Sequence, residues 1–442
     1  MSAAAAMPDR ERSMRALALA ALAGTSIEWY DFFIYGTATA LIFPTVFFPK
    51  SMPPIVALLA SFSTFAVGFL ARPVGGVLFG HFGDRVGRKR ALVVALLLMG
   101  VGTTLIGCLP GYAQIGPIAP IALVLLRFGQ GLAIGGQWGG AMLMVTESAP
   151  AHRRGFFGSF AQAGAPCGVL LANLAFLLVN GNVSQDEFMA WGWRIPFLAS
   201  VALIALGLFI QHRLEETAAF RNLRAGPDAG RDVGVEPERS PVLEALRLYP
   251  RQIALAAGAF IAQNLTFYIL VTWIIAYGTD PAGLALPRGT MLAGVTIGAL
   301  AMAPTLFLTG AFSDRFGRRG VYMAGAALLS VWSFAVFPLI DTGSLLWIGV
   351  AIGVGQICSA MMYGPQAAFL AELFSTRVRY SAASLGYQLG AICGGGLAPL
   401  IATTLMTAFG TPLAVSAYMA AGCAITIFSV WQLSETHGTE LS

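Results

Sequence analysis

The chain has 442 residues, of which 57% are hydrophobic and 11% are charged, and its mean hydropathy is +0.74. A water-soluble protein of this length needs more polar side chains to cover its surface, so the composition excludes that class and predicts an integral membrane protein. The formal net charge of +5 does not indicate nucleic-acid binding, because the basic residues gather in loops that would face an anionic membrane surface.

Twelve apolar segments are long enough to cross roughly 30 Å of hydrocarbon at about 1.5 Å per residue. The first is too long, and too polar at its centre, for a cleaved signal peptide. The sequence therefore predicts an all-α membrane protein with twelve transmembrane helices. In chain order they are residues 17–45, 54–79, 91–109, 118–146, 155–179, 192–211, 252–278, 289–312, 320–340, 345–371, 382–407 and 411–433.

The basic residues predict the orientation. With both termini in the cytoplasm, 21 of the 26 Lys and Arg residues fall in inside segments, and only Lys50 and Arg288 fall in outside loops. Such an asymmetry is typical of the positive-inside rule. We therefore expect a multi-pass protein of a bacterial inner membrane with cytoplasmic termini.

Two phrases occur twice. GHFGDRVGRKR at 80–90 returns as GAFSDRFGRRG at 310–320, and ESAPAHRRGFFGSFAQAG at 147–164 resembles ELFSTRVRYSAASLGYQLG at 372–390. The offsets of 230 and about 225 residues are nearly equal, which is typical of a duplicated transporter. We expect a six-helix bundle at 1–211, a cytoplasmic linker at 212–251 and a second bundle at 252–442.

Four ionisable residues lie deep in predicted helices, namely Glu28, Asp31, Arg72 and Arg127. A charge at mid-bilayer costs at least ~2.5–3.5 kcal/mol, so each needs a reason to be there. The depths of Asp31 and Arg127 agree within about 6 Å at the helical rise. They could form a carboxylate–guanidinium pair that protonation switches, or a permanent ion pair that only locks two helices. Glu28 lies on the same face as Asp31 and could instead pair with Arg72.

The remaining candidates for solute binding are polar or aromatic residues in the predicted helices, although such residues more often serve packing. The first half contributes Trp29, Tyr30, Tyr35, Arg72, Gln137 and Trp138, and the second contributes Gln263, Asn264, Tyr268, Trp273, Tyr363, Gln366, Tyr387 and Gln388.

Metal and cofactor chemistry has no support in the sequence. The five cysteines are scattered singly through apolar segments without a CxxC, and the four histidines lie at or beyond helix ends. No HExxH, nucleophile elbow or phosphate loop is present. We expect no cofactor, no metal site and no enzymatic activity.

With these residues in view, the chain resembles the major facilitator superfamily over essentially its whole length. The loop phrases match that superfamily's G-x-x-x-D-R-x-G-R-[KR] signature twice. The resemblance implies two six-helix bundles around a central cavity, which rock to alternate access and are held by charged clasps on the cytoplasmic side. The implied gating residues are Gly80, Asp84, Arg85, Gly87, Arg88, Glu147 and Arg154 in the first half, and Asp314, Arg315, Gly317, Arg318, Glu372 and Arg379 in the second.

Within the superfamily, EWYDFFIYG at 28–36 and WGWRIPFL at 191–198 are similar to the metabolite:proton symporter group, especially its shikimate transporters. That group carries proton-coupled uptake of small solutes such as shikimate, citrate, 2-oxoglutarate and proline betaine. Arg127 falls where proton-coupled sugar porters place an arginine facing a helix-one aspartate. One departure is Gln137, since the group usually has a glutamate in this GGQWGG phrase.

The resemblance and the membrane charges together favour a monomeric, proton-coupled importer of a small organic solute, most plausibly a carboxylate, with Asp31, Arg127 and Glu28 in proton coupling. Gln137 keeps an uncoupled facilitator or an exporter open. A transporter-like receptor that signals through 212–251 is a further alternative.

Overall fold

The computed structural model describes residues 3–86, 88–215, 247–374 and 379–438; side chains at 3–13, 80–92, 136–141, 143–144, 208–215 and 379–381 are outside this description. Over the described residues the chain is helical, and long helical segments occupy all twelve predicted positions. They are α1 (Ala3–Leu41), α3 (Pro54–Val86), α4 (Arg88–Cys108), α6 (Ile118–Ser148), α7 (Arg154–Asn182), α9 (Arg194–Glu215), α12–η3–α13 (Pro250–Thr279), α14 (Arg288–Phe316), α15 (Arg318–Ile340), α16 (Leu345–Leu373), α17–η4–α18 (Arg379–Phe409) and α19 (Leu413–Gln432).

Ten of these segments are long and apolar enough to cross a membrane on their described residues alone. An eleventh results if Gln185–Gly192 and Arg194–Gly207, which meet at a 47° bend, form one span. The described part of α4 that passes as apolar, Val93–Cys108, is shorter. The structure therefore confirms the prediction of an all-α membrane protein.

One predicted helix differs in detail, and the predicted linker cannot be compared. The first helix was expected to reach residue 45, but α1 ends at Leu41 and a short helix α2 (Phe43–Val46) follows. Pro44 lies in the first turn of α2, where its missing N–H costs nothing. The predicted linker at 212–251 falls mostly on residues 216–246, which lie outside the described residues, so the domain boundaries stay predictions.

The second half contains two helices with a wider turn near their middle. In each a π-helical turn, η3 (Ile269–Trp273) or η4 (Ile392–Gly396), joins two α-helical pieces. Such turns displace the residues that follow them and are frequent at functional sites. Both turns pack next to the first half: η3 contacts α1 and η4 contacts α3.

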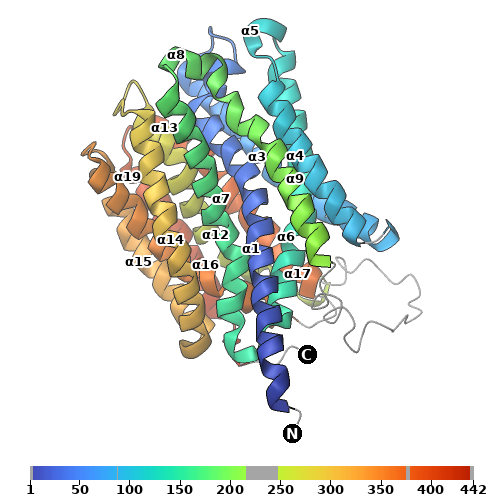
Figure 1. Cartoon of the computed structure of the whole chain (residues 1–442). Helices are drawn as coiled ribbons and strands as arrows, with labels where there is room; N and C mark the ends of the chain where they lie inside the picture. Colours follow the sequence, from blue (N-terminus) through green and yellow to red (C-terminus); the bar gives the residue numbers. More distant parts are fainter. Residues whose placement is uncertain (1–2, 87, 216–246, 375–378, 439–442) are drawn as a thin grey trace.

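The two halves meet along α7 and α14. Figure 1 shows α1 beginning at the end of the bundle at which α9 finishes, and we call this the terminal end. There, Gly155 of α7 and Gly310 of α14 touch, since a Cβ on Gly155 would collide with the Gly310 carbonyl. At the opposite end Asn180 lies beside Gly289. The halves are thus in contact at both ends of this helix pair.

The start of α15 is held by a carboxylate from the end of the chain. Glu435 accepts hydrogen bonds from the backbone N–H groups of Arg318 (2.8 Å) and Arg319 (3.0 Å), where helical N–H groups have no intrahelical partner. Burial raises the pKa of Glu435, but the backbone N–H groups of Arg318, His437, Arg319 and Thr436 outweigh it and hold the pKa below its usual range.

Gly317 precedes this helix with φ +94° and ψ +157°, a backbone conformation that is essentially restricted to glycine. A Cβ there would also lie 2.8 Å from the Glu435 carboxylate. We therefore expect Gly317→Ala to destabilise the protein by roughly 1–3 kcal/mol, read as a lower Tm in detergent. The matched control is Gly320→Ala, three residues into α15 with no atom near its Cβ position. It should leave Tm unchanged or raise it; equal Tm values for both variants would contradict this account.

Candidate functional site

Two buried arginines are brought together by glycines. Helices α3 and α6 pack so closely that a Cβ on Gly135 of α6 would collide with the carbonyl of Arg72 on α3. One turn away, a Cβ on Gly131 would collide with the Gly68 carbonyl, and a Cβ on Gly68 would lie 2.6 Å from Nε of Arg127. Only glycine permits this approach, so the α3–α6 contact holds both guanidinium groups in one place.

The two guanidinium groups lie over the faces of aromatic rings. Phe32 of α1 is shared, with Cζ of Arg72 4.8 Å and Cζ of Arg127 4.4 Å from its centroid. Arg72 also lies 4.2 Å from Phe69, and Arg127 lies 4.0 Å from Tyr35. A desolvated cation–π contact is worth ~2 kcal/mol, which offsets only part of the cost of burying a charge.

Most N–H groups of the two arginines have no partner. Arg72 is 0% exposed and none of its three guanidinium nitrogens meets an acceptor at hydrogen-bond distance and angle, although the hydroxyls of Tyr268 and Tyr387 lie close to it. Arg127 is 1% exposed and its Nε and Nη2 have no partner. Among the described residues neither guanidinium makes an ion pair. Buried donors and charges are normally paired, so this arrangement is suited to binding an anion.

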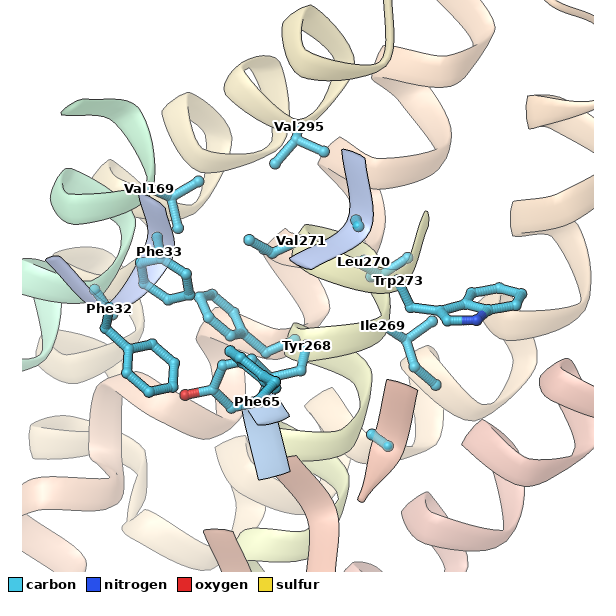
Figure 2. Close-up of a cluster of buried hydrophobic side chains, with 14 of the residues drawn as sticks. Phe32, Phe33, Phe65, Val169, Tyr268, Ile269, Leu270, Val271, Trp273 and Val295 are labelled. Atoms are coloured by element: carbon cyan, nitrogen blue, oxygen red, sulfur yellow. The ribbon is translucent and has the colours of Figure 1, made fainter. Parts of the chain in front are cut away.

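The second half faces this place with tyrosines. The hydroxyls of Tyr268 and Tyr387 are electrostatic neighbours of Arg72, and the Tyr268 ring packs 5.2 Å from Phe69 and 5.9 Å from Phe32. Figure 2 shows Phe32, Phe33 and Tyr268 gathered in one cluster, with Phe65 beside them. The site thus lies where the two halves meet.

Asp31 is not ion-paired with Arg127, contrary to both interpretations of the sequence, the switched pair and the permanent one. Its carboxylate accepts a hydrogen bond from Ser200 of α9 (2.6 Å) and has the Thr103 hydroxyl of α4 as a neighbour, which itself donates to the Met99 carbonyl (2.9 Å). Arg127 instead lies over Tyr35, one turn further along α1. The depth estimate of about 6 Å amounts to this turn of helix, which is enough to separate the two groups.

The second proposed pair is wrong as well, because Arg72 makes no ion pair with Glu28. The reason is direction: the Arg72 guanidinium is turned onto Phe69 and toward the tyrosines of the second half.

A chain of side-chain hydrogen bonds runs from Arg127 to Thr103, a neighbour of Asp31. Nη1 of Arg127 donates to Oε1 of Gln130 (3.1 Å), and Nε2 of Gln130 donates to the Thr103 hydroxyl (2.8 Å), which neighbours Asp31. Thr103, Gln130 and Ser200 were missed by the sequence analysis. Gln130 follows Arg127 by three residues on one helix face, which was the available signal; nothing local pointed to Thr103 or Ser200.

Several predicted binding residues form hydrogen bonds within one half, and their part in solute binding stays a prediction. Tyr30 donates to the Pro196 carbonyl (2.7 Å), and Trp273 donates to Thr403 (2.9 Å) and points away from the aromatic cluster in Figure 2. Asn264 donates to the Phe260 carbonyl (3.0 Å).

Other candidates lie at the boundary of the halves or are buried near it. Gln366 of α16 accepts from Gln162 of α7 (3.4 Å) and donates to Tyr322 (2.8 Å). Trp29 stacks on Phe33 at 5.3 Å. Further candidates are buried, namely Gln263, Tyr363, Tyr387 and Gln388, whose Oε1 has no partner; the side chains of Gln137 and Trp138 lie outside the described residues.

At the terminal end, four of the implied gating residues form one network between the halves. The Asp314 carboxylate accepts from the N–H groups of Gly155 (2.7 Å) and Phe156 (2.8 Å), which start α7. Arg318 joins Asp314 (2.6 Å) to Glu372 (3.2 Å), and Arg154 of the first half lies 3.7 Å from Glu372. A carboxylate at a helix N-terminus is favourable because it meets unpaired N–H groups and the positive end of the helix dipole.

The other implied gating residues are not seen in this network. Arg315 is exposed and lies over Phe316, and Glu147 is exposed. The first-half copy of the signature, with Gly80, Asp84, Arg85, Gly87 and Arg88, and also Arg379, lies outside the residues whose side chains are described.

Comparison with known proteins agrees with this arrangement. The family model of the Major Facilitator Superfamily matches residues 31–391 and 295–441. The chain belongs to this superfamily. The chain is 39% identical to the inner membrane metabolite transport protein YhjE of Escherichia coli, over 100% of both chains, and 39% identical to the shikimate transporter of that organism, over 96% of this chain and 95% of the relative.

More distant relatives extend the comparison. The proline/betaine transporter of Escherichia coli is 33% identical over 89% of this chain and 78% of the relative. A solved structure of the xylose transporter XylE, in a partially occluded inward-open conformation, superposes with a TM-score of 0.74 at 18% identity, covering 97% of this chain and 100% of that one. This superfamily member is therefore a membrane transporter and not an enzyme, and the predicted family and fold are confirmed.

The terminal-end network yields a prediction. Asp314→Asn removes the charge that holds the start of α7, so we expect the halves to separate there. Spin labels at the exposed positions 152 and 315, in a variant without the five native cysteines, should show a longer or broader distance distribution. The control Asp341→Asn removes the charge from a carboxylate that accepts from Tyr277 inside one half, and should leave that distribution unchanged. An unchanged distribution in Asp314→Asn would contradict the interpretation of this network.

Proposed function

We propose that this protein imports a small organic carboxylate together with protons across a bacterial inner membrane, with both termini in the cytoplasm. The observation that carries the proposal is the pair of buried guanidinium groups, Arg72 and Arg127, with five N–H-bearing nitrogens that have no partner.

The chemistry of these donors favours a carboxylate. A guanidinium group only donates, and its planar fork matches the two oxygens of a carboxylate. The rings of Phe32, Phe69 and Tyr268 offer flat apolar surface for the rest of the solute. Shikimate, proline and betaine, the compounds in the names of the relatives, each carry a carboxylate.

Charge balance links the solute to a proton. The four deep ionisable residues comprise two acids, Glu28 and Asp31, and two bases, Arg72 and Arg127. A bound monocarboxylate adds one negative charge to this set, and protonation of Asp31 removes one. The loaded and empty transporter then carry the same charge through the membrane interior, where an unbalanced charge is costly. One proton per monocarboxylate follows.

Access would alternate through the terminal end. The network of Asp314, Arg318, Glu372 and Arg154 closes that end in the state described. Under the proposed orientation this is the cytoplasmic end, so release of the solute requires the network to open.

The experiment is uptake of radiolabelled shikimate, benzoate, citrate, 2-oxoglutarate, proline and glycine betaine into proteoliposomes, with and without an inward proton gradient at clamped voltage. Accumulation of a carboxylate only with the gradient supports the proposal. Equal flux with and without the gradient would replace it with an uncoupled facilitator, and gradient-driven efflux would replace it with an exporter.

Asp31→Asn should abolish gradient-driven accumulation while solute exchange continues. The variant lacks the carboxylate that binds the proton but keeps both arginines. The control is Asp186→Asn, the same substitution at an exposed position in α8 (Gln185–Glu187). Accumulation by Asp31→Asn at the wild-type level would remove Asp31 from proton coupling.

Arg72→Lys and Arg127→Lys should each weaken solute binding about 10-fold or more, because lysine keeps the charge and loses the fork; a hydrogen bond to a charged group is worth about 1.5–3 kcal/mol. Isothermal titration with the accumulated compound measures this. Arg251→Lys, an exposed residue bonded to Gln432, is the control. Unchanged affinity in both variants would place the solute elsewhere.

A further inference from the structure

We infer that Gln130 and Thr103 form a hydrogen-bond relay through which protonation of Asp31 controls the affinity of Arg127 for the solute. The inference rests on the proposed function and assigns positioning roles to two residues between the proton-binding and solute-binding groups.

The direction of the relay is fixed by what each group can donate. Arg127 is a pure donor, so it must face the carbonyl oxygen of Gln130, as the 3.1 Å contact has it. The Gln130 amide nitrogen then points to Thr103 and donates to its hydroxyl at 2.8 Å. Both bonds therefore donate toward Thr103, the neighbour of Asp31. A reversed glutamine amide would place its N–H group against an N–H group of Arg127.

The last step has two alternatives because a hydroxyl has a single hydrogen. Having accepted from Gln130, the Thr103 hydroxyl can donate to the Asp31 carboxylate or to the Met99 carbonyl, which lies 2.9 Å away. An ionised carboxylate is the stronger acceptor, and a protonated one is weaker. The protonation state of Asp31 thus selects between two arrangements of the same hydroxyl.

The consequence for Arg127 follows from cooperativity along the chain. With Asp31 ionised, each donor is polarised toward the carboxylate, and Arg127 is held by Gln130. With Asp31 protonated, the Thr103 hydroxyl donates to the Met99 carbonyl. The hydroxyl is then a weaker acceptor for the Gln130 amide, so the Gln130 carbonyl oxygen compensates less of the positive charge of Arg127. The solute carboxylate then binds more tightly. By linkage, bound solute favours the protonated state of Asp31 to the same extent.

The charged and titratable groups near Asp31 lie on α1, α6 and α3, whereas the groups beside its carboxylate from α4 and α9 are uncharged hydroxyls. On α1 itself these groups are Glu28 and Tyr30. Helix α6 contributes Arg127 with Tyr35 of α1 beside it, and α3 contributes Arg72, which neighbours Arg127 together with Tyr268. At Asp31, α4 and α9 contribute the uncharged hydroxyls of Thr103 and Ser200.

The test uses the carboxylate of the panel above that wild-type protein accumulates, with its Kd measured at pH 5.5 and pH 8. We expect wild-type affinity to be about 5-fold or more tighter at the lower pH, the lower limit of typical coupling between sites. Thr103→Val and Gln130→Met remove the relay while keeping the size of the side chain, and should bring the ratio of the two Kd values close to that of Asp31→Asn. Thr103→Ser keeps the hydroxyl and should restore the wild-type ratio.

The matched control is Thr104→Val. Thr104 is the next residue of α4 and makes the same type of bond to the backbone, to Gly100 at 2.9 Å, so a merely structural effect would appear in both variants. A wild-type pH ratio in Thr103→Val and Gln130→Met would overturn the relay and leave proton coupling intact. A wild-type protein without gradient-driven accumulation or pH-dependent affinity would overturn the proposed function and the relay together.

Discussion

The burial of two arginines that form no ion pair with any described residue is the constraint on which the rest of the structure depends. Arg72 and Arg127 are as buried as any core residue, yet aromatic faces and a single glutamine are their main partners. Attraction to aromatic rings offsets only part of the desolvation cost, so the free energy of this region falls when an anion arrives. The close α3–α6 packing through Gly68, Gly131 and Gly135 prevents the guanidinium groups from reaching a more polar environment.

The two halves contribute different groups to this site. The first half provides the charges, and the second half provides tyrosines and the two π-helical turns that face them. Their contact is polar at the terminal end, where carboxylates meet arginines and the start of α7, and aromatic at the centre. A polar contact at an edge can exchange its partners for water, whereas the aromatic centre must repack as a unit. Rocking of one half against the other is consistent with that distribution.

The sequence predicted the helices well because their signal is local: a run of apolar residues of sufficient length predicts a span wherever it occurs. It also identified Arg72, Arg127 and Asp31, since a charge within such a run is conspicuous. It failed on their partners. Depth along a helix is known to about one turn, and one turn separates Asp31, which faces Ser200, from Tyr35, which lies under Arg127. Thr103 and Ser200 are ordinary hydroxyl residues whose importance depends on which helices pack around α1. Nor does composition tell which face of a helix meets the other half, so it could not predict that Tyr30 and Trp273 form hydrogen bonds within their own halves.

The absence of a direct bond between Asp31 and Arg127 is itself informative about transport. Breaking a buried ion pair costs about 3–5 kcal/mol, so a direct pair would oppose solute binding each time the arginine had to change partners. In the proposed relay, an intervening amide and hydroxyl transmit the presence of the carboxylate while leaving Nε and Nη2 of Arg127 available. Under the proposed function, the arginine binds a solute carboxylate without first releasing Asp31, and the proton adjusts the strength of that binding. A relay of this kind couples two ligands more weakly than a direct pair, and it avoids trapping either of them.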